Sequence, residues 1–542
     1  MSAHPRHPSR RAVLTTGLGI AALAGISACS SDSDGDSSTS QGGSGGGSAA
    51  ALPAYIPYEG VEADLPVQDG RTSSGFFAYP AGPATISTGT PGDGEPITAM
   101  GPTSFALPPA MDQNAFWQEM NERLGSELHI TLTPGGEYDA KFATTVAGRA
   151  LPDFFHVGST QSLPQFMASE AADLTDFLSG DAIADYPGLA NIPTASWQDC
   201  IFDGRIRAIP IQRGLVNLPT LFARQDLLEA AGITATPQNF EELSDISKEL
   251  TGGNTWAWGS LPLAYARATV DVPSYWMIVD GTFTSTLGDE RHEQALEAVR
   301  ALQDAGVVNP DAASAPTSTR KDWFGAGRSI FHEDSFIAWF SLYVQHGSVP
   351  GLNIQALPVI GFDGGTGTQF VPNPNYGITA ISAGSADRAE TLLRVADYLA
   401  APFGTEEYLF CKFGIDGVNF ELEGSDPVPT DAASEVNIGS LYIADAARVI
   451  YAPNREAVVQ AAWDQQNRVT EKSFQDPTLG LYSETASRKL ASLEGALGDA
   501  ELDIMLGRRP VSDWSAAVEE FNAGGGADIL AEYQAAYDEL QG

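Results

Sequence analysis

Aromatic side chains recur in the middle of this chain, close to small polar groups. A flat aromatic ring packs against the apolar face of a sugar ring, while amide, carboxylate and arginine groups hydrogen-bond the hydroxyls at its rim. For any single tryptophan, the alternative interpretation is packing in a core. The candidates are Trp256, Trp258, Tyr275, Trp276, Trp323, Phe336, Trp339 and Tyr376.

Three small polar residues follow an apolar stretch at 153–157 that is typical of a buried strand. Ser159, Thr160 and Gln161 would present hydroxyl and amide groups at the tip of this strand. Ligands of α/β sheets bind beyond the carboxyl ends of strands, so these residues are predicted to contact a ligand. The alternative for Gln161 is an ordinary residue at the start of a helix.

An enzyme is the rival interpretation. His332, Glu333 and Asp334 gather three titratable groups, and paired carboxylates serve glycosidases. The sequence assigns no second acid to them, however, and it contains no HExxH, GxSxG or phosphate-loop motif. We therefore predict a protein that is not an enzyme, with a secreted carbohydrate-active hydrolase or lyase as a remaining alternative.

The elements that must position these residues alternate between strand and helix. Phe116, Met120 and Leu124 recur at the spacing of one helix face. The alternation predicts an α/β fold with a parallel sheet, crossover helices and ligand loops at 101–104 and 158–161. The expected strands are 97–100, 129–133 and 153–157, and the expected helices are 114–124, 140–147, 224–231, 239–250, 291–305, 388–400 and a helical C-terminus from 483.

The N-terminus has the features of an export signal. Arg10 and Arg11 precede an apolar run to Ala28 that is shorter than the roughly 20 residues of a membrane span. The letters SRRAVL resemble a twin-arginine signal, and ISAC, ending at Cys29, resembles a lipobox. Residues 1–28 are thus a predicted signal peptide and Cys29 a predicted lipidated N-terminus. The alternative is an ordinary signal with a chance cysteine.

Residues 30–50 contain no large apolar side chain, so this segment cannot bury enough surface to fold. We predict a lipidated cysteine and flexible Gly/Ser tether at 29–50, which reaches about 25 Å as a coil. An extended strap, rich in Pro and Gly, is expected at 51–95. The remainder exceeds one hydrophobic core, so two lobes are expected.

The chain is strongly acidic. Its formal net charge is −40, which becomes −43 when three arginines leave with the signal. A nucleic-acid binder needs a basic footprint, so this class is excluded. A polyanionic ligand is also disfavoured, unless a local arginine cluster receives it.

Two further cysteines, Cys200 and Cys411, remain after Cys29. Outside the cytoplasm they would form one disulfide, or stay two separate buried thiols. No zinc or redox spacing is present, and we expect no cofactor and no metal.

Short motifs follow one another in a fixed order from about residue 97 to the C-terminus. They are LPDFF at 151–155, AIP at 208–210, LFARQDLLEAAGI at 221–233, FGAGRSIF at 324–331, YGITAIS at 376–382, GIDGVNF at 414–420 and a C-terminal set at 508–514, 524–526 and 532–533. Their order and spacing resemble the extracellular solute-binding proteins of carbohydrate ABC importers, in particular the large lipoprotein branch.

The resemblance implies a two-lobed, periplasmic-binding-protein-like fold of type II, with lobes joined by crossing strands around a ligand cleft. It implies a monomer, lipid-anchored to the extracytoplasmic face of the cell membrane, that captures a sugar or oligosaccharide by lobe closure and delivers it to a permease. A peptide-binding importer component is the alternative. Lobe 1 is predicted at 96–213 plus 378–445, and lobe 2 at 218–372 plus 446–542.

The resemblance also assigns binding residues in lobe 2. Asp334, Phe336 and Trp339 follow the strand at 329–331, where relatives line the cleft. We expect Trp339 to stack on a sugar ring and Asp334 to hydrogen-bond a hydroxyl, with Gln161 closing from the other lobe.

Four further residues complete the predicted site. Tyr275 and Trp276 lie where similar proteins offer an aromatic, and Tyr376 begins the strand that re-enters lobe 1. Arg213 lies near the expected hinge crossing, where a structural salt bridge is the alternative role.

Large relatives often carry an acidic loop resembling a calcium site after the helix that ends here at Leu250. This chain has TGGNTWAW at 251–258, without a carboxylate. Calcium takes six to eight oxygen ligands, several from carboxylates, so we expect no such site.

Overall fold

The computed structural model describes residues 50–68, 72–103, 106–160, 162–346 and 349–541. All of them belong to one unit, Ser48–Gly542. The predicted signal peptide, the predicted tether up to residue 49 and the predicted lipidation site Cys29 lie outside the described residues, as does Gln161.

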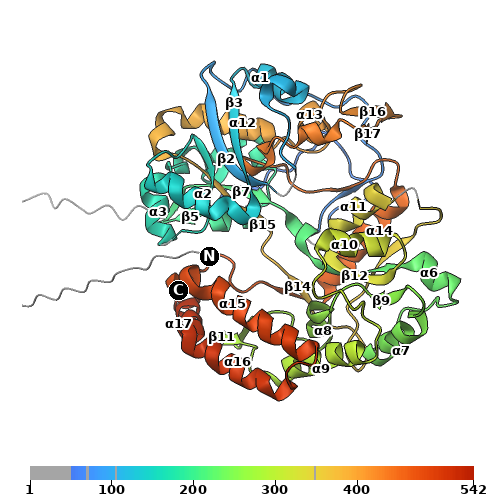
Figure 1. The fold of residues 1–542 in the computed structure, drawn as a ribbon. Helices are drawn as coiled ribbons and strands as arrows, with labels where there is room; N and C mark the ends of the chain where they lie inside the picture. Colours follow the sequence, from blue (N-terminus) through green and yellow to red (C-terminus); the bar gives the residue numbers. More distant parts are fainter. Residues whose placement is uncertain (1–49, 69–71, 104–105, 161, 347–348, 542) are drawn as a thin grey trace, which may run out of the picture. The chain divides into compact units, whose positions relative to one another are not determined.

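A five-stranded mixed sheet forms the centre of the first core, in the order β3-β2-β4-β15-β7 (Figure 1). Its first three strands are parallel, as the alternation of strands and helices predicts. Strands β15 and β7 extend this parallel part of the sheet, and β15 runs antiparallel to both β4 and β7. The strands are Ile97–Thr103 (β2), Leu128–Pro134 (β3), Phe154–His156 (β4), Ile209–Gln212 (β7) and Asn375–Ile381 (β15).

Helices cover this sheet. The side chain of Asn114 caps the first helix by accepting from the backbone N of Trp117, and the helix ends at Gly125, whose φ of 68° suits glycine. Strand β2 extends to Thr103, so the expected loop from 101 belongs largely to the strand. The helices are Ala115–Leu124 (α1), Gly135–Ala147 (α2), Leu163–Glu170 (α3), Thr175–Leu178 (α4), Pro187–Ala190 (α5) and Ala389–Leu399 (α12).

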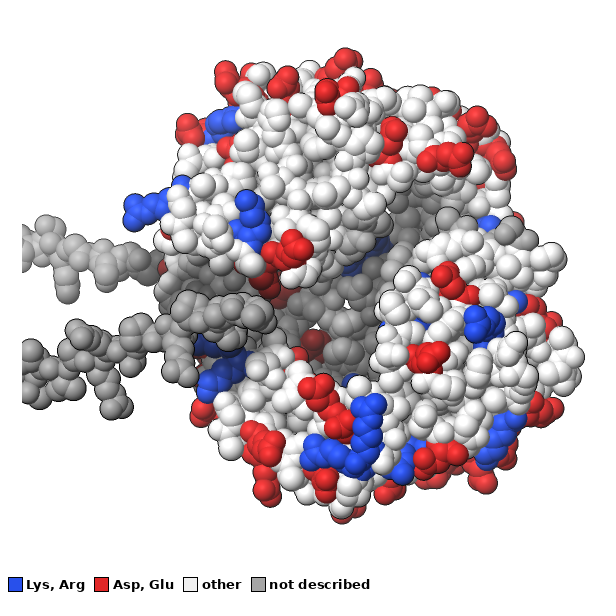
Figure 2. Space-filling model, viewed as in Figure 1, with Lys and Arg blue, Asp and Glu red and all other residues white. Residues whose placement is uncertain are grey.

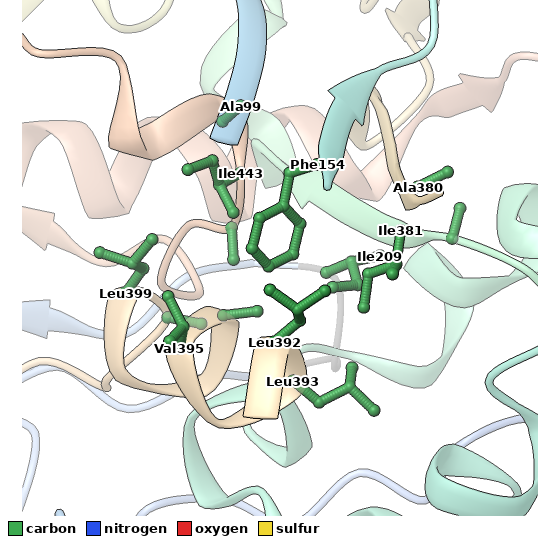
Figure 3. Packing of buried hydrophobic residues seen from close by; sticks show 14 of the residues in the cluster. Ala99, Phe154, Ile209, Ala380, Ile381, Leu392, Leu393, Val395, Leu399 and Ile443 are labelled. Atoms are coloured by element: carbon green, nitrogen blue, oxygen red, sulfur yellow. The ribbon is translucent and has the colours of Figure 1, made fainter. Parts of the chain in front are cut away.

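The packing between α12 and the sheet holds the first core together (Figure 3). Leu392 points toward the ring of Phe154 from β4, with Ile381 of β15 nearby, and all three are fully buried. Burying each such side chain stabilises the fold by about 1.5–3 kcal/mol. This core draws on residues 97–209 and 378–444, so two distant parts of the chain fold as one body.

A second, four-stranded sheet has the order β13-β8-β12-β9. Strand β12 is antiparallel to β8 and parallel to β9. The strands are Pro219–Arg224 (β8), Trp256–Trp258 (β9), Ser329–Ser335 (β12) and Ile354–Leu357 (β13). The helices between them are Gln225–Ala230 (α6), Phe240–Leu250 (α7), Leu263–Thr269 (α8), Glu290–Asp304 (α9), Thr317–Gly325 (α10) and Ala338–His346 (α11).

The C-terminal part is helical from Glu484, as predicted. Trp514 is fully buried here, and its indole N donates to the carbonyl of Leu287 at 2.8 Å. This bond ties the C-terminal helices to the second core. The C-terminal helices are Glu484–Met505 (α15), Trp514–Phe521 (α16) and Ala527–Gln541 (α17). Two helices precede them: Glu406–Phe413 (α13), which packs on the first core, and Glu456–Glu471 (α14).

The remaining strands form two-stranded ribbons. They are Gly75–Phe76 (β1) with Ile450–Tyr451 (β18), Ile201–Phe202 (β5) with Arg205–Ile206 (β6), Trp276–Val279 (β10) with Thr282–Ser285 (β11), Gln369–Val371 (β14) with Ser473–Gln475 (β19), and Phe420–Glu423 (β16) with Asp426–Pro429 (β17).

The chain leaves the first core at three places, and these crossing segments contact one another. They are 213–218, between β7 and β8; 372–374, between β14 and β15; and 445–449, before β18. The backbone N of Arg213 donates to the carbonyl of Pro374 at 2.6 Å, and that of Arg448 donates to the Gln212 side chain at 3.1 Å. The predicted lobe boundaries near these crossings stay a prediction.

Within the described residues of the segment 51–95, called the strap here, β1 is the only strand and there is no helix. Strand β1 pairs with β18. The hydroxyl of Tyr79 donates to the carbonyl of Thr405 at 2.7 Å, which fixes the strap to the folded body.

Cys200 is buried and Cys411 is half-buried, and both are free thiols, so the disulfide alternative is wrong. Across the described ranges, no helix is long and apolar enough to cross a membrane. The same residues contain no group of three or more His, Cys, Asp or Glu side chains placed to hold a metal ion.

Candidate functional site

A cavity of about 350 Å³ lies where the crossing segments meet. Arg213 and Arg448 line it from two crossings, and Tyr376 lines it from β15. Ile337, which follows β12 of the second sheet, is also part of its wall. The volume lies in the range of small-molecule sites, and the wall combines apolar and polar groups as such sites do.

A second hollow, of about 510 Å³, lies beneath the strap and shares Arg448 with the first. Strap residues such as Tyr55, Tyr58 and Phe76 cover it. None of the predicted binding residues lines it, whereas Arg213 and Tyr376 both line the first cavity. We therefore take the first cavity, called the crossing cavity below, as the candidate site.

Tyr376 presents an aromatic face to the crossing cavity. The register of β15 against β7 shifts between Asn375 and Gly377, which leaves Tyr376 43% exposed. Gly377 permits this arrangement, because a Cβ there would lie 2.6 Å from the His156 ring. The Tyr376 ring lies 5.5 Å from the ring of Tyr442 and 5.6 Å from that of His156. A supported, half-exposed ring of this kind can stack on an apolar ligand face.

His156 packs beside the Tyr376 ring as a neutral imidazole. Burial, with the nearby charge of Arg213, lowers the pKa of His156 to about 4. At neutral pH the imidazole therefore adds no charge behind Tyr376.

Three basic side chains converge on one carboxylate behind the cavity wall. Asp445 is fully buried, and its Oδ2 accepts from Arg213 at 2.5 Å and from Arg448 at 2.6 Å. Its Oδ1 accepts from Lys412, near the end of α13. Burial alone would raise the pKa of Asp445, but the charges of Arg448, Lys412 and Arg213 outweigh it and hold the pKa well below its usual range.

Burial disfavours the charged forms of these basic side chains and so lowers their pKa values. Burial, together with the charge of Arg448, lowers the pKa of Arg213 to about 10, although the charge of Asp445 opposes this shift. The pKa of Lys412 is lowered for the same reason, first by burial. Arg213 thus makes the salt bridge that was its alternative role, and it also lines the cavity.

The aromatic residues predicted in lobe 2 lie elsewhere. Trp339 and Phe336 are each 1% exposed and belong to a hydrophobic core. The Trp339 indole N donates to the carbonyl of Ile354 at 3.0 Å, and its ring packs 5.6 Å from that of Phe222. The stacking expectation for Trp339 therefore needs correction, because no face of its ring is accessible. The exposed neighbour Ile337 lines the cavity instead.

Asp334 is held by protein partners. Its carboxylate lies 3.1 Å from Lys321 and 3.1 Å from His332. These partners outweigh its burial and lower its pKa to about 2. It does not line the crossing cavity.

Glu333 and Asp334 do not form a carboxylate pair. They are successive residues of β12, so their side chains point to opposite faces of the sheet. Burial raises the pKa of Glu333 to about 7, while that of Asp334 is low. The hydrogen bond between His332 and Asp334, two residues apart on one face, agrees with this alternation.

Tyr275 and Trp276 lie in the second core, away from the crossing cavity. The Tyr275 hydroxyl donates to Glu501 at 3.0 Å, and its ring lies under the guanidinium of Arg267. Trp276 is 5% exposed and packs among the rings of Phe283, Phe521 and Tyr533. Both therefore stabilise the core in this structure.

Ser159 and Thr160 follow β4, as predicted, but they do not line the cavity. The Ser159 hydroxyl donates to Asp139 at 2.8 Å.

The sequence interpretation missed most of the cavity wall. Lys412 and Arg448 are far apart in the chain and follow no local motif, and Tyr442 ends a 3-10 helix of only three residues, Ser440–Tyr442. The only signal was indirect, since an acidic chain makes any cluster of basic residues notable. The missed residues include Ile337, Lys412, Asn437, Ser440, Tyr442 and Arg448.

The fold is that of two-lobed α/β binding proteins. An N-glycan transport solute-binding protein of Streptococcus pneumoniae has a similar structure, with a TM-score of 0.62 at 16% identity; the match covers 82% of this chain and 99% of that one. The model of the bacterial extracellular solute-binding protein family matches residues 109–405, more than half of the chain. The chain therefore belongs to this family.

Two Bacillus subtilis (strain 168) proteins are similar over most of their length. One is a polygalacturonan/rhamnogalacturonan-binding protein, YtcQ, 22% identical over 444 residues that cover 78% of this chain and 88% of that protein. The other is the lipoprotein LipO, 19% identical over 491 residues that cover 83% and 94%.

Proposed function

We propose that this protein captures a sugar or oligosaccharide in the crossing cavity and delivers it to the permease of an ABC importer. The observation that carries this proposal is the place of the cavity. Arg213 and Tyr376 belong to the first sheet or its crossings, whereas Ile337 follows a strand of the second sheet. A ligand there touches both parts of the fold.

The side chains of the cavity wall also favour a sugar as the ligand. Tyr376 offers a half-exposed ring face, which the buried ring of Tyr442 supports, and Asn437 and Ser440 contribute amide and hydroxyl groups to the same wall. This combination suits the apolar face and the polar rim of a sugar ring. Relatives whose names specify polygalacturonan, rhamnogalacturonan and N-glycan support it further.

In this proposal a monomer works by closing two lobes around the ligand. Closure is favoured by the difference between the ligand's affinities for the closed and open forms. The lobes would be 96–213 plus 378–445 and 218–372 plus 446–542, so that the three crossings act as the hinge. The permease would recognise the closed form.

The experiment that tests this function measures binding and turnover together. We expect the purified full chain to bind a saccharide at one per chain and to return it unchanged, because Glu333 and Asp334 point to opposite faces and form no acid pair. Calorimetry gives the stoichiometry and chromatography of the recovered saccharide gives turnover. Steady product release that Glu333→Gln abolishes would show an enzyme instead.

We further propose that a twin-arginine signal exports the chain and that a lipid on Cys29 anchors it outside the cytoplasm. The lipoprotein relative and the motif around Cys29 support this anchor. Cys29→Ala should release the protein into the medium or leave it unprocessed, since the lipid supplies most of the membrane affinity. Cell fractionation detects release into the medium, and mass measurement of the N-terminus detects loss of processing. A variant that is processed and membrane-bound like the wild type would contradict the anchor.

A further inference from the structure

The crossing cavity carries an excess of positive charge in a chain that is strongly negative overall. Three cations, Arg213, Lys412 and Arg448, line it, and no Asp or Glu is among its lining residues. The single carboxylate that contacts all three, Asp445, is fully buried behind them. One carboxylate neutralises one cation, so an excess of two positive charges remains.

This local excess contrasts with the chain as a whole, whose formal net charge is −40. Figure 2 shows acidic side chains spread over one face of the molecule, with basic side chains among them. Basic residues outside the cavity typically have acidic partners of their own, such as Arg388 with Asp93 at 2.9 Å and Arg291 with Asp289 at 2.6 Å. The three cavity cations share a single carboxylate.

The hydrogen-bonding capacity of this cation cluster is not fully used within the protein. The Nε of Arg448 is buried and has no hydrogen-bond partner. The Arg213 side chain is only 10% exposed, so water screens its charge poorly. A buried donor without a partner costs free energy that a ligand acceptor can recover.

We infer that the crossing cavity selects an acidic saccharide, one whose sugar ring carries a carboxylate that the Arg213–Lys412–Arg448 cluster receives. This inference rests on the function proposed above and narrows its ligand class. A guanidinium presents a planar fork of donors that matches a carboxylate, whereas a neutral hydroxyl meets only one donor.

The neighbouring groups can hold the rest of such a ring. The guanidinium of Arg213 lies 5.5 Å from the centre of the Tyr376 ring. A sugar that stacks on Tyr376 therefore brings a ring substituent within reach of the cluster. After one sugar carboxylate enters, one positive charge still remains in the cluster. The cavity would therefore also tolerate a second acidic sugar unit of the same oligosaccharide.

The test compares acidic oligosaccharides with their own methyl esters, which keep the shape and lose the charge. The probes are di- and trisaccharides of galacturonate, glucuronate and mannuronate, titrated calorimetrically into the full chain. We expect at least one acid to bind about 10- to 100-fold more tightly than its ester, since a hydrogen bond between charged groups is worth this factor. Raising the salt concentration should reduce this preference.

A variant of the cluster tests whether its charges cause the preference for the acid over the ester. Arg448→Gln should lower the affinity for the acid by a much larger factor than the affinity for the ester, while Arg448→Lys should retain part of the preference. Arg508→Gln is the matched control, because its side chain is 63% exposed and lies outside the cavity. The melting temperature of each ligand-free variant shows whether it has folded.

The outcomes separate this inference from the proposed function. Equal affinity for acid and ester, or binding of neutral oligosaccharides alone, would overturn the acidic specificity and leave sugar capture standing. An equal loss for acid and ester in Arg448→Gln would also overturn it. Failure of every saccharide, acidic or neutral, would overturn the proposed function as well.

Discussion

Asp445→Asn is expected to lower the free energy of unfolding by about 3–5 kcal/mol at pH 7. The amide keeps the shape of the carboxylate but removes the charge that Arg213, Lys412 and Arg448 share. Three cations would then face one another in a poorly solvated place, which is why the expected loss is large. Chemical denaturation of the two proteins measures it.

The pH dependence of this loss identifies its cause. The folded-state pKa of Asp445 is depressed below the unfolded value near 3.8, so its contribution is fully present above that pH and disappears as pH falls through the folded pKa. The difference between wild type and variant should therefore shrink in acid.

Asp503→Asn is the control for this prediction. It makes the same chemical change in an exposed pair with Arg508 and should cost at most about 1 kcal/mol. A loss for Asp445→Asn no larger than the control would mean that the buried cluster adds little stability.

Trp339→Ala should also cost about 3–5 kcal/mol of stability, because the indole fills a core and donates to the carbonyl of Ile354. Melting of the ligand-free protein reveals this loss. Saccharide affinity of the folded fraction should stay close to that of the wild type, since Trp339 does not line the cavity.

Ile337→Ala is the neighbouring control for Trp339→Ala. Ile337 is 43% exposed, so its truncation should change stability by only about 0.5 kcal/mol. If Trp339→Ala instead melted like the wild type and bound saccharide far more weakly, the ring would be a ligand contact after all.

Local patterns predicted the parts of the fold that depend on local physics. The helix at 114–124 follows from the spacing of its apolar residues, and the strand at 153–157 from a short apolar run. Strand β15 was not predicted as antiparallel, because its pairing with β4 and β7 joins residues more than 160 positions apart. The short hydrophobic patterns within a strand carry no information about such pairing.

The site was less predictable than the fold, for the same reason. Tyr376 and Arg213 were identified as candidates, and both line the cavity. Trp339, Phe336 and Trp276 were identified by residue type and motif position, yet aromatic residues fill cores as readily as binding sites, and all three are buried. Lys412, Arg448 and Asp445 meet only because the first core closes around the crossings, which no local spacing specifies.

The most direct test of sugar capture in the crossing cavity is the saccharide affinity of Tyr376→Ala beside that of Tyr376→Phe. Losing the stacking face should weaken binding about 10- to 150-fold, since burying an aromatic face is worth roughly 1.5–3 kcal/mol. The phenylalanine variant keeps the ring and should bind nearly as the wild type does. An alanine variant that is folded and binds the saccharide with unchanged affinity would contradict this account and place the ligand elsewhere.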